Sequence, residues 1–372
     1  MRSFTGEKDR SKELGFCTSF KTIMMLFVVL GHACIIYSGF WSAFPPATES
    51  KVFDFLVRWL DTFHTYAFVF ISGFIFYYMK YIYKKYQNGM SIIKKKAKRL
   101  IEPYIITCII WAIPVAFLVR KMSVKTVFHK YIWGEDPDQL WFLLMLFWVF
   151  VFSVVIFRFV DFDNLKIIYK ILLLGICVGG YLCTVGLRVI EMPDLFGVQA
   201  ALEYELFFVG GMVYASLEND WITKLNKNTF MGLEIVLLTA SLLGAALYNY
   251  YLGRVIKYLI FPIVSFGGIF FWTFLVQRWS YIKKDKAVRT QSKLWNYLMK
   301  NNFYIYLIHQ QLIYISLNLI NKPAVPPVVV VLINFIIALW GSGMIWFVAS
   351  KIYGKYIHFI NTSKGFSLGT KL

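Results

Sequence analysis

The sequence predicts an all-α protein, a polytopic transmembrane helical bundle of about ten spans. Of its 372 residues, 59% are hydrophobic and 16% are charged, whereas about a quarter of the residues in a soluble domain carry charge. The apolar residues form runs of about 20, the length of a helix that crosses a bilayer. Ten runs fit this description: residues 22–41, 62–79, 100–119, 139–157, 167–186, 196–215, 230–250, 256–276, 301–320 and 328–350.

These runs occupy nearly the whole chain, so we expect one integral membrane domain over residues 1–372. The first run is longer than the apolar core of a signal peptide and has no evident cleavage site, which indicates a retained span. A polar tail precedes it at 1–21, and the longest polar loop lies at 277–295. We expect both segments on the cytoplasmic side.

The charges between the runs predict the orientation, because lysine and arginine are enriched in cytoplasmic loops. With a cytoplasmic N-terminus and strict alternation, 29 of the 39 lysines and arginines fall in cytoplasmic segments and 10 in external ones. This bias predicts an N-in, C-in topology. It also accounts for the net charge of +19 without a nucleic-acid partner. The lipid bilayer is the expected partner, and a composition rich in Lys, Ile, Phe and Tyr favours the cytoplasmic membrane of a bacterium.

No pattern in the chain indicates a metal site. Of the five cysteines, no two form a CxxC pair, and most lie inside apolar runs. We therefore expect no bound metal and no disulfide framework.

Five ionisable residues in or beside the spans are candidates for a site: His32, His64, Glu203, Glu205 and His309. Such groups are costly in a bilayer and often functional. Two other interpretations stay open: hydrogen bonding between helices, and a proton relay of intramembrane His and Glu residues in a transporter. Against a transporter, the chain has no inverted repeat and no matched pair of Gly/Pro-broken helices.

Lys21 and His32 are the sharpest pair of candidates. Eleven residues separate them, which corresponds to about 16 Å along a helix and to nearly the same helix face. Lys21 then lies at the cytoplasmic edge and His32 deep in the membrane. A neutral imidazole is the usual general base near pH 7.

A second candidate is the basic cluster from Lys94 to Arg99, which holds five cations in six residues. At the start of a helix on the cytoplasmic face it would bind phosphates well. The alternative is ordinary cytoplasmic positive charge. Glu102 follows closely, and it would either weaken phosphate binding or pair with Arg99.

At these residues the chain resembles acyltransferase family 3 of integral membrane O-acyltransferases. The first span of that family carries a basic residue and, after ten others, a histidine, as in KTIMMLFVVLGHA here. Four further matches follow in the family's order: FHTYAFVFISGFIFYY, the pair Lys96 and Arg99 before Leu-x-x-Pro-Tyr, the LWFL element with Trp141, and NFYIYLIHQQ with His309. Glu102 departs from the pattern, because an apolar residue is expected there.

The resemblance implies an enzyme that moves an acetyl or other acyl group from acetyl-CoA (acyl-CoA) on the cytoplasmic side to a carbohydrate hydroxyl. A cell-surface or exported polysaccharide is the expected acceptor. Lys21, Lys96 and Arg99 would bind the donor.

The resemblance also suggests roles around the reaction. His32 would be the catalytic base, and Glu205 or Glu203 the carboxylate that orients it, with Glu205 preferred. His64, Trp141 and His309 would bind the substrate on the acceptor side.

Overall fold

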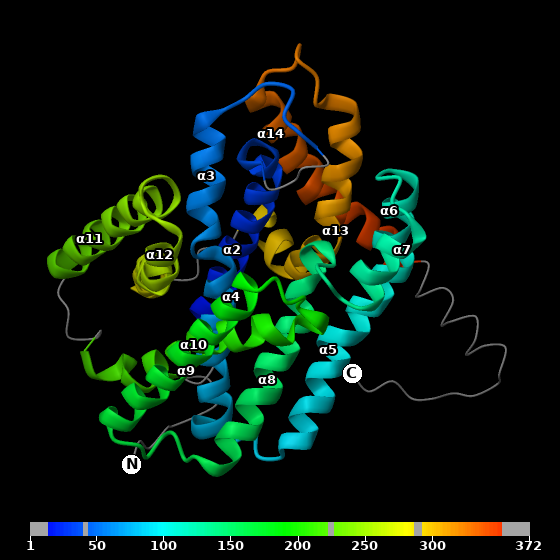
Figure 1. Ribbon diagram of the computed structural model, residues 1–372. Helices are drawn as coiled ribbons and strands as arrows, with labels where there is room; N and C mark the ends of the chain where they lie inside the picture. The colour runs from blue at the N-terminus through cyan, green and yellow to red at the C-terminus, as the bar shows by residue number, and fades with distance from the viewer. Residues whose placement is uncertain (1–13, 40–43, 222–226, 286–291, 352–372) are drawn as a thin grey trace.

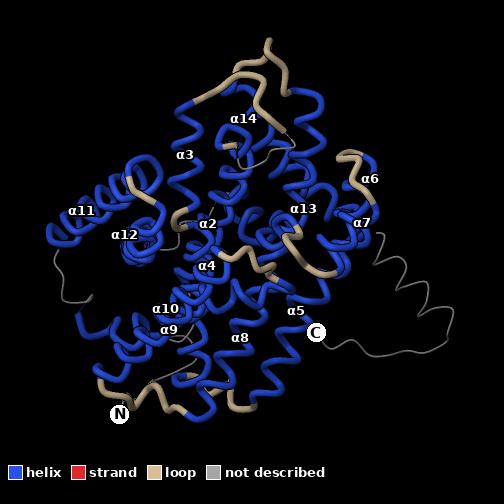
Figure 2. The backbone as a smooth tube through the Cα atoms, in the orientation of Figure 1, coloured by secondary structure: helices blue, strands red, loops and turns tan. Residues whose placement is uncertain are grey.

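The computed structural model describes residues 14–39, 44–221, 227–285 and 292–351. In these segments the chain is helical and contains no strand (Figures 1 and 2). The all-α bundle predicted from the sequence is therefore confirmed.

Nine helices in the described segments are long and apolar enough to cross a membrane. They are Gly15–Ser38, Lys51–Ile82, Gly89–Leu118, Asp138–Phe159, Ile167–Val189, Met231–Tyr251, Ile256–Trp279, Lys293–Ile320 and Pro327–Lys351. The tenth predicted run, 196–215, corresponds to α10 (Val198–Trp221). This helix carries the buried Glu203 and Glu205, which make it less apolar than the other nine.

Several of these spans consist of consecutive helical segments. They are α2 (Gly15–Cys34) with η1 (Ile35–Ser38), α3 (Lys51–Asp61) with α4 (His64–Tyr77) and η2 (Tyr78–Ile82), α5 (Gly89–Thr107) with η3 (Cys108–Ala112) and α6 (Ile113–Leu118), η5 (Asp138–Leu140) with α8 (Trp141–Phe159), and α14 (Pro327–Ile336) with η9 (Ile337–Gly341). The other elements are α7 (Val124–Val127), η4 (Phe128–Ile132), α9 (Ile167–Val189), η6 (Leu195–Gly197), α11 (Lys227–Ala246), η8 (Leu247–Tyr251), α12 (Arg254–Asp285) and α13 (Lys293–Ile320).

Two predicted polar segments are more helical than expected. Within 277–295, α12 continues to Asp285 and α13 begins at Lys293, while 286–291 lie outside the described residues. The predicted tail, 1–21, also ends in helix, because α2 begins at Gly15 and already includes Lys21. All three helices therefore extend beyond their apolar runs.

Loops assigned to the same side of the membrane lie together in the structure. At one end of the bundle, Asn321 bonds the backbone of Ala47 and Pro45, each at 2.9 Å. Figure 1 shows these two connections side by side at the top. At the opposite end, Tyr77 bonds Asp163 and Lys80 bonds the carbonyl of Phe157.

A third contact joins two loops that the sequence places on the external side. The Phe196 amide donates to the Trp133 carbonyl at 3.2 Å. The alternation of the spans therefore agrees with the packing of the loops. Which end is cytoplasmic stays a prediction from the loop charges.

The tightest helix crossing joins α4 and α10. A Cβ on Gly73 would lie 1.9 Å from the carbonyl oxygen of Phe208, and a Cβ on Gly211 would lie 1.9 Å from that of Phe70. Both positions therefore require glycine, because small residues let helix backbones approach closely in membranes. By contrast, Gly175 on α9 has open space around it.

We expect Gly73→Ala to destabilise the protein, although alanine favours a helix over glycine by about 1 kcal/mol. Its methyl group would push two backbones apart, and overpacking of a core costs about 1–3 kcal/mol. The measurement is the temperature at which the detergent-solubilised protein loses its monodisperse size-exclusion peak. Gly175→Ala is the matched control and should leave that temperature unchanged or raise it. If both variants lost the monodisperse peak at the same temperature, the close crossing of α4 and α10 would be contradicted.

Candidate active site

A cavity of about 990 Å³ lies in the bundle between α2, α4, α5, α8 and α13. Lys21 and His32 both line it, as their spacing on one helix face predicts. The other predicted site residues in its wall are His64, Lys96, Arg99 and Trp141. Six of the nine candidates, from four helices, thus meet in one space.

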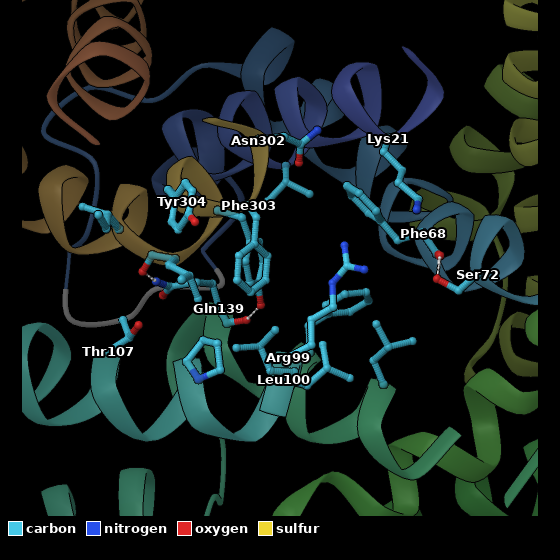
Figure 3. Close-up of a pocket in the computed structure, with 18 of the residues that line it drawn as sticks. Lys21, Phe68, Ser72, Arg99, Leu100, Thr107, Gln139, Asn302, Phe303 and Tyr304 are labelled. Carbon is cyan, nitrogen blue, oxygen red and sulfur yellow. Dashed lines mark hydrogen bonds between the residues drawn. The ribbon is translucent and has the colours of Figure 1, made fainter. Parts of the chain in front are cut away.

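One end of the cavity is strongly basic. Lys21 on α2 and Arg99 on α5 point into it from opposite sides (Figure 3), and each lies within electrostatic reach of the other. The Lys96 ammonium lies 3.6 Å from the centre of the Phe150 ring, which holds the cation against an aromatic face. Lys98 and Lys300 add two more cations to the wall.

These charges are not neutralised by carboxylates of the described residues. Within those segments, Lys21, Lys96 and Arg99 form no ion pair. Glu102 also lines the cavity but does not pair with Arg99. Positive charges gathered in one partly buried space attract an anion, and lysine and arginine bind phosphate groups well.

The other end of the cavity holds a pair of histidines. His32 Nδ1 lies 2.7 Å from His309 Nε2, and the two rings are nearly parallel with centroids 5.0 Å apart. His309 Nδ1 lies 3.0 Å from the Ile305 carbonyl and 2.8 Å from that of Tyr306. His309 is completely buried.

This geometry decides which nitrogen of His32 can act as a base. A carbonyl only accepts hydrogen bonds, so Nδ1 of His309 carries the hydrogen and Nε2 of the neutral ring accepts. His32 Nδ1 must then donate to it. The lone pair of His32 therefore resides on Nε2, and the ring lines the cavity.

A comparison with known protein families agrees with the motifs that contain Lys21, His32 and His309. A family model described as an acyltransferase domain matches residues 18–347. The chain belongs to acyltransferase family 3. It is therefore a membrane acyltransferase, as the resemblance implied. No curated protein and no solved structure matches it.

Glu205 does not orient the histidine of this acyltransferase, and that assignment was wrong. The Ser153 hydroxyl donates to Glu205 at 2.6 Å. The alternative, Glu203, contacts Arg188 and accepts a bond from Tyr66 at 3.0 Å. Both carboxylates are thus engaged on α10, and the orienting contact comes from His309.

His64 and Trp141 lie where a substrate could touch them, whereas His309 does not. His64 Nδ1 bonds the Leu60 carbonyl at 2.5 Å, and its ring lines the cavity. Trp141 begins α8 and packs against Tyr204, with the ring centroids 5.6 Å apart. His309 lies behind His32, so its expected substrate contact is replaced by a positioning role.

A buried polar network lies beside the cavity at its histidine end. Asp138 receives bonds from Arg120 at 3.0 Å, Tyr314 at 3.0 Å and Tyr131, and its carboxylate also lies 3.2 Å from the ammonium of Lys130. Burial and the neighbouring Asp138 raise the pKa of Tyr131, so its hydroxyl stays a donor.

The next residue extends this network to the cavity wall. Gln139 bonds Gln311 at 2.8 Å and the Leu307 carbonyl at 2.9 Å. Neither Asp138 nor Gln139 was predicted from the sequence as part of the site. The signals were available, because Asp138 and Gln139 directly precede LWFL, and two glutamines follow His309 within an apolar span.

We expect His309→Leu to lower turnover by roughly 10²-fold, because loss of the acceptor for His32 Nδ1 removes the constraint on the general base, whose full contribution is 10²–10⁴. The Michaelis constant for the donor should stay unchanged, since the cations lie at the other end of the cavity. His309→Gln should restore much of the rate, because its amide can still accept from His32.

The assay is acyl transfer per folded molecule. His129→Leu, an exposed histidine on the 119–138 connection, is the control. Wild-type turnover in His309→Leu would refute the assignment of the His32 tautomer.

Proposed function

We propose that the enzyme transfers an acetyl group from acetyl-CoA to a hydroxyl of a cell-surface or exported polysaccharide. The observation that carries the proposal is one cavity with un-neutralised cations at one end and an oriented imidazole at the other. Membership in the acyltransferase family supports acyl transfer over the proton relay of a transporter.

The basic end suits the phosphates of coenzyme A. Lys21, Lys96 and Arg99 come from two helices that face each other across the cavity. Eleven residues of helix, or about 16 Å, separate Lys21 from His32 along α2. The thin pantetheine arm would span that distance and bring the thioester to His32.

The chemistry would proceed by general-base catalysis. His32 Nε2 takes the proton of the acceptor hydroxyl while the hydroxyl oxygen attacks the thioester carbonyl. The new C–O bond forms as the C–S bond breaks, and the proton passes from His32 to the departing thiolate. The products are an ester and free coenzyme A. His64 and Trp141 would contact the acceptor, and the Trp141 ring offers an apolar face to a sugar.

We expect Lys96→Ala combined with Arg99→Ala to raise the Michaelis constant for acetyl-CoA by about 10²- to 10⁴-fold with turnover nearly kept. Charge-assisted bonds contribute about 1.5–3 kcal/mol each and act in the ground state as well as the transition state. Lys94→Ala combined with Lys95→Ala removes the same charge from exposed positions outside the cavity and serves as the control. Unchanged donor affinity in the Lys96/Arg99 variant would leave the cluster with a topological role only.

We expect His32→Gln to lose transfer by about 10²–10⁴-fold, the usual contribution of a general base. The protein should still fold and bind acetyl-CoA, because glutamine keeps a polar side chain at that position. Release of free thiol per folded molecule is the measurement, with His129→Gln as the matched control. Near wild-type specific activity in His32→Gln would contradict general-base catalysis by His32.

A further inference from the structure

We infer that the acceptor is anchored in the bilayer by a hydrocarbon chain and reaches His32 sideways. The route is an opening between the third span, Gly89–Leu118, and the last span, Pro327–Lys351. The inference rests on the proposed function and narrows its acceptor to a lipid-linked carbohydrate.

Some side chains line the cavity and are at the same time exposed at the surface of the bundle. On the third span these are Ile106 and Ile110, which are 48% and 69% exposed. On the last span, Ala349 is exposed and lines the cavity together with Ile345. The two members of each pair are four residues apart and share a helix face. The wall is therefore apolar and open to the membrane at this place.

The opening lies between the depth of the cations and that of His32. Ile106 and Ile110 follow Arg99 by seven and eleven residues, or by about 10 and 16 Å along the helix. Ile345 precedes Lys351 by six residues, or by about 9 Å. Since the hydrocarbon core is about 30 Å thick, the opening extends from the basic side to about the middle of the bilayer.

A local irregularity of the third span coincides with the opening. The segment Cys108–Ala112 is a π-helix, and such bulges often mark functional sites. Ile110 lies inside it. Its neighbour Trp111 donates to the Ile308 carbonyl at 3.1 Å and so joins the third span to α13 at the inner side of the opening.

The far end of the cavity offers no second route among the described residues. The described side chains that line it there are at most 7% exposed and form its cover: His64, Gln139 and Leu307. The buried Asp138 network holds this cover in place.

The basic entrance is the remaining way in, and the donor would fill it. Coenzyme A phosphates bound to Lys21, Lys96 and Arg99 would occupy the space between α2 and α5. Within the described part of the chain, a second molecule can then reach His32 only through the opening in the membrane. A free sugar has no access from the hydrocarbon core, whereas the headgroup of a lipid-linked sugar enters with its chain left between the spans. The hydroxyl–acyl bond forms and the thioester bond breaks as described above.

The test uses permeabilised cells of the native host that lack the gene and carry either the wild-type protein or a variant. They are supplied with [¹⁴C]acetyl-CoA and then extracted with chloroform–methanol. We expect base-labile label in the extracted lipid fraction. Ala349→Trp should reduce this label at least tenfold, and Val348→Trp, which is also exposed on the last span but outside the cavity, should keep it. Ile110→Trp, with Ile109→Trp as its control, is the second pair if Ala349→Trp does not fold.

Binding of acetyl-CoA to each purified variant distinguishes a failure of the membrane route from a failure of the proposed function. The inference predicts unchanged donor affinity in the variants at the opening. Normal donor binding with label only in water-soluble sugars or polymer would overturn the membrane route and leave the proposed function standing. Full labelling of lipid in Ala349→Trp and Ile110→Trp would also overturn it. A wild-type protein that neither binds nor consumes acetyl-CoA would overturn the proposed function itself.

Discussion

The lack of water inside the bilayer constrains every polar group of this chain. A group buried there must find its partner within the protein or face a cavity. Glu205 takes the first course with Ser153, and Asp138 takes it with several donors. Lys21 and Arg99 take the second course, since they face the cavity without an ion pair among the described residues. Polar groups that are paired within the protein therefore belong to the supporting structure, and the cations that face the cavity, unpaired among the described residues, belong to the site.

The same constraint explains the layout of the cavity. Charged groups gather at its basic end, where water and the proposed phosphorylated donor would reach them. At the depth of His32 the chain uses two imidazoles instead, and their hydrogen bonds end on the backbone carbonyls of Ile305 and Tyr306. A neutral chain of bonds satisfies each donor without burying a net charge. It also leaves the lone pair of His32 on Nε2, the base of the proposed mechanism.

Close helix packing supports this arrangement from behind. The glycine crossing with α10 lies at Gly73 and Gly211, and α4 lines the cavity through neighbouring residues such as Phe68 and Ser72. One helix thus serves as a packing surface and as a wall of the site. The opening between the third and last spans is the opposite case, because there the wall is thin and the apolar side chains face both the cavity and the lipid.

Features that depend on distance along one helix could be predicted from the sequence. The number and type of spans follow from run lengths, the alternation of the spans from loop charge, and the shared face of Lys21 and His32 from helix geometry. The family motifs also predicted that Lys96, Arg99, His64 and Trp141 belong to one site. The partner of His32 could not be predicted, because 277 residues separate it from His309. Only the rotation and packing of α2 and α13 bring these rings together. The sequence pattern does not encode that rotation, so Glu205 seemed as good a partner until the tertiary structure placed it beside Ser153.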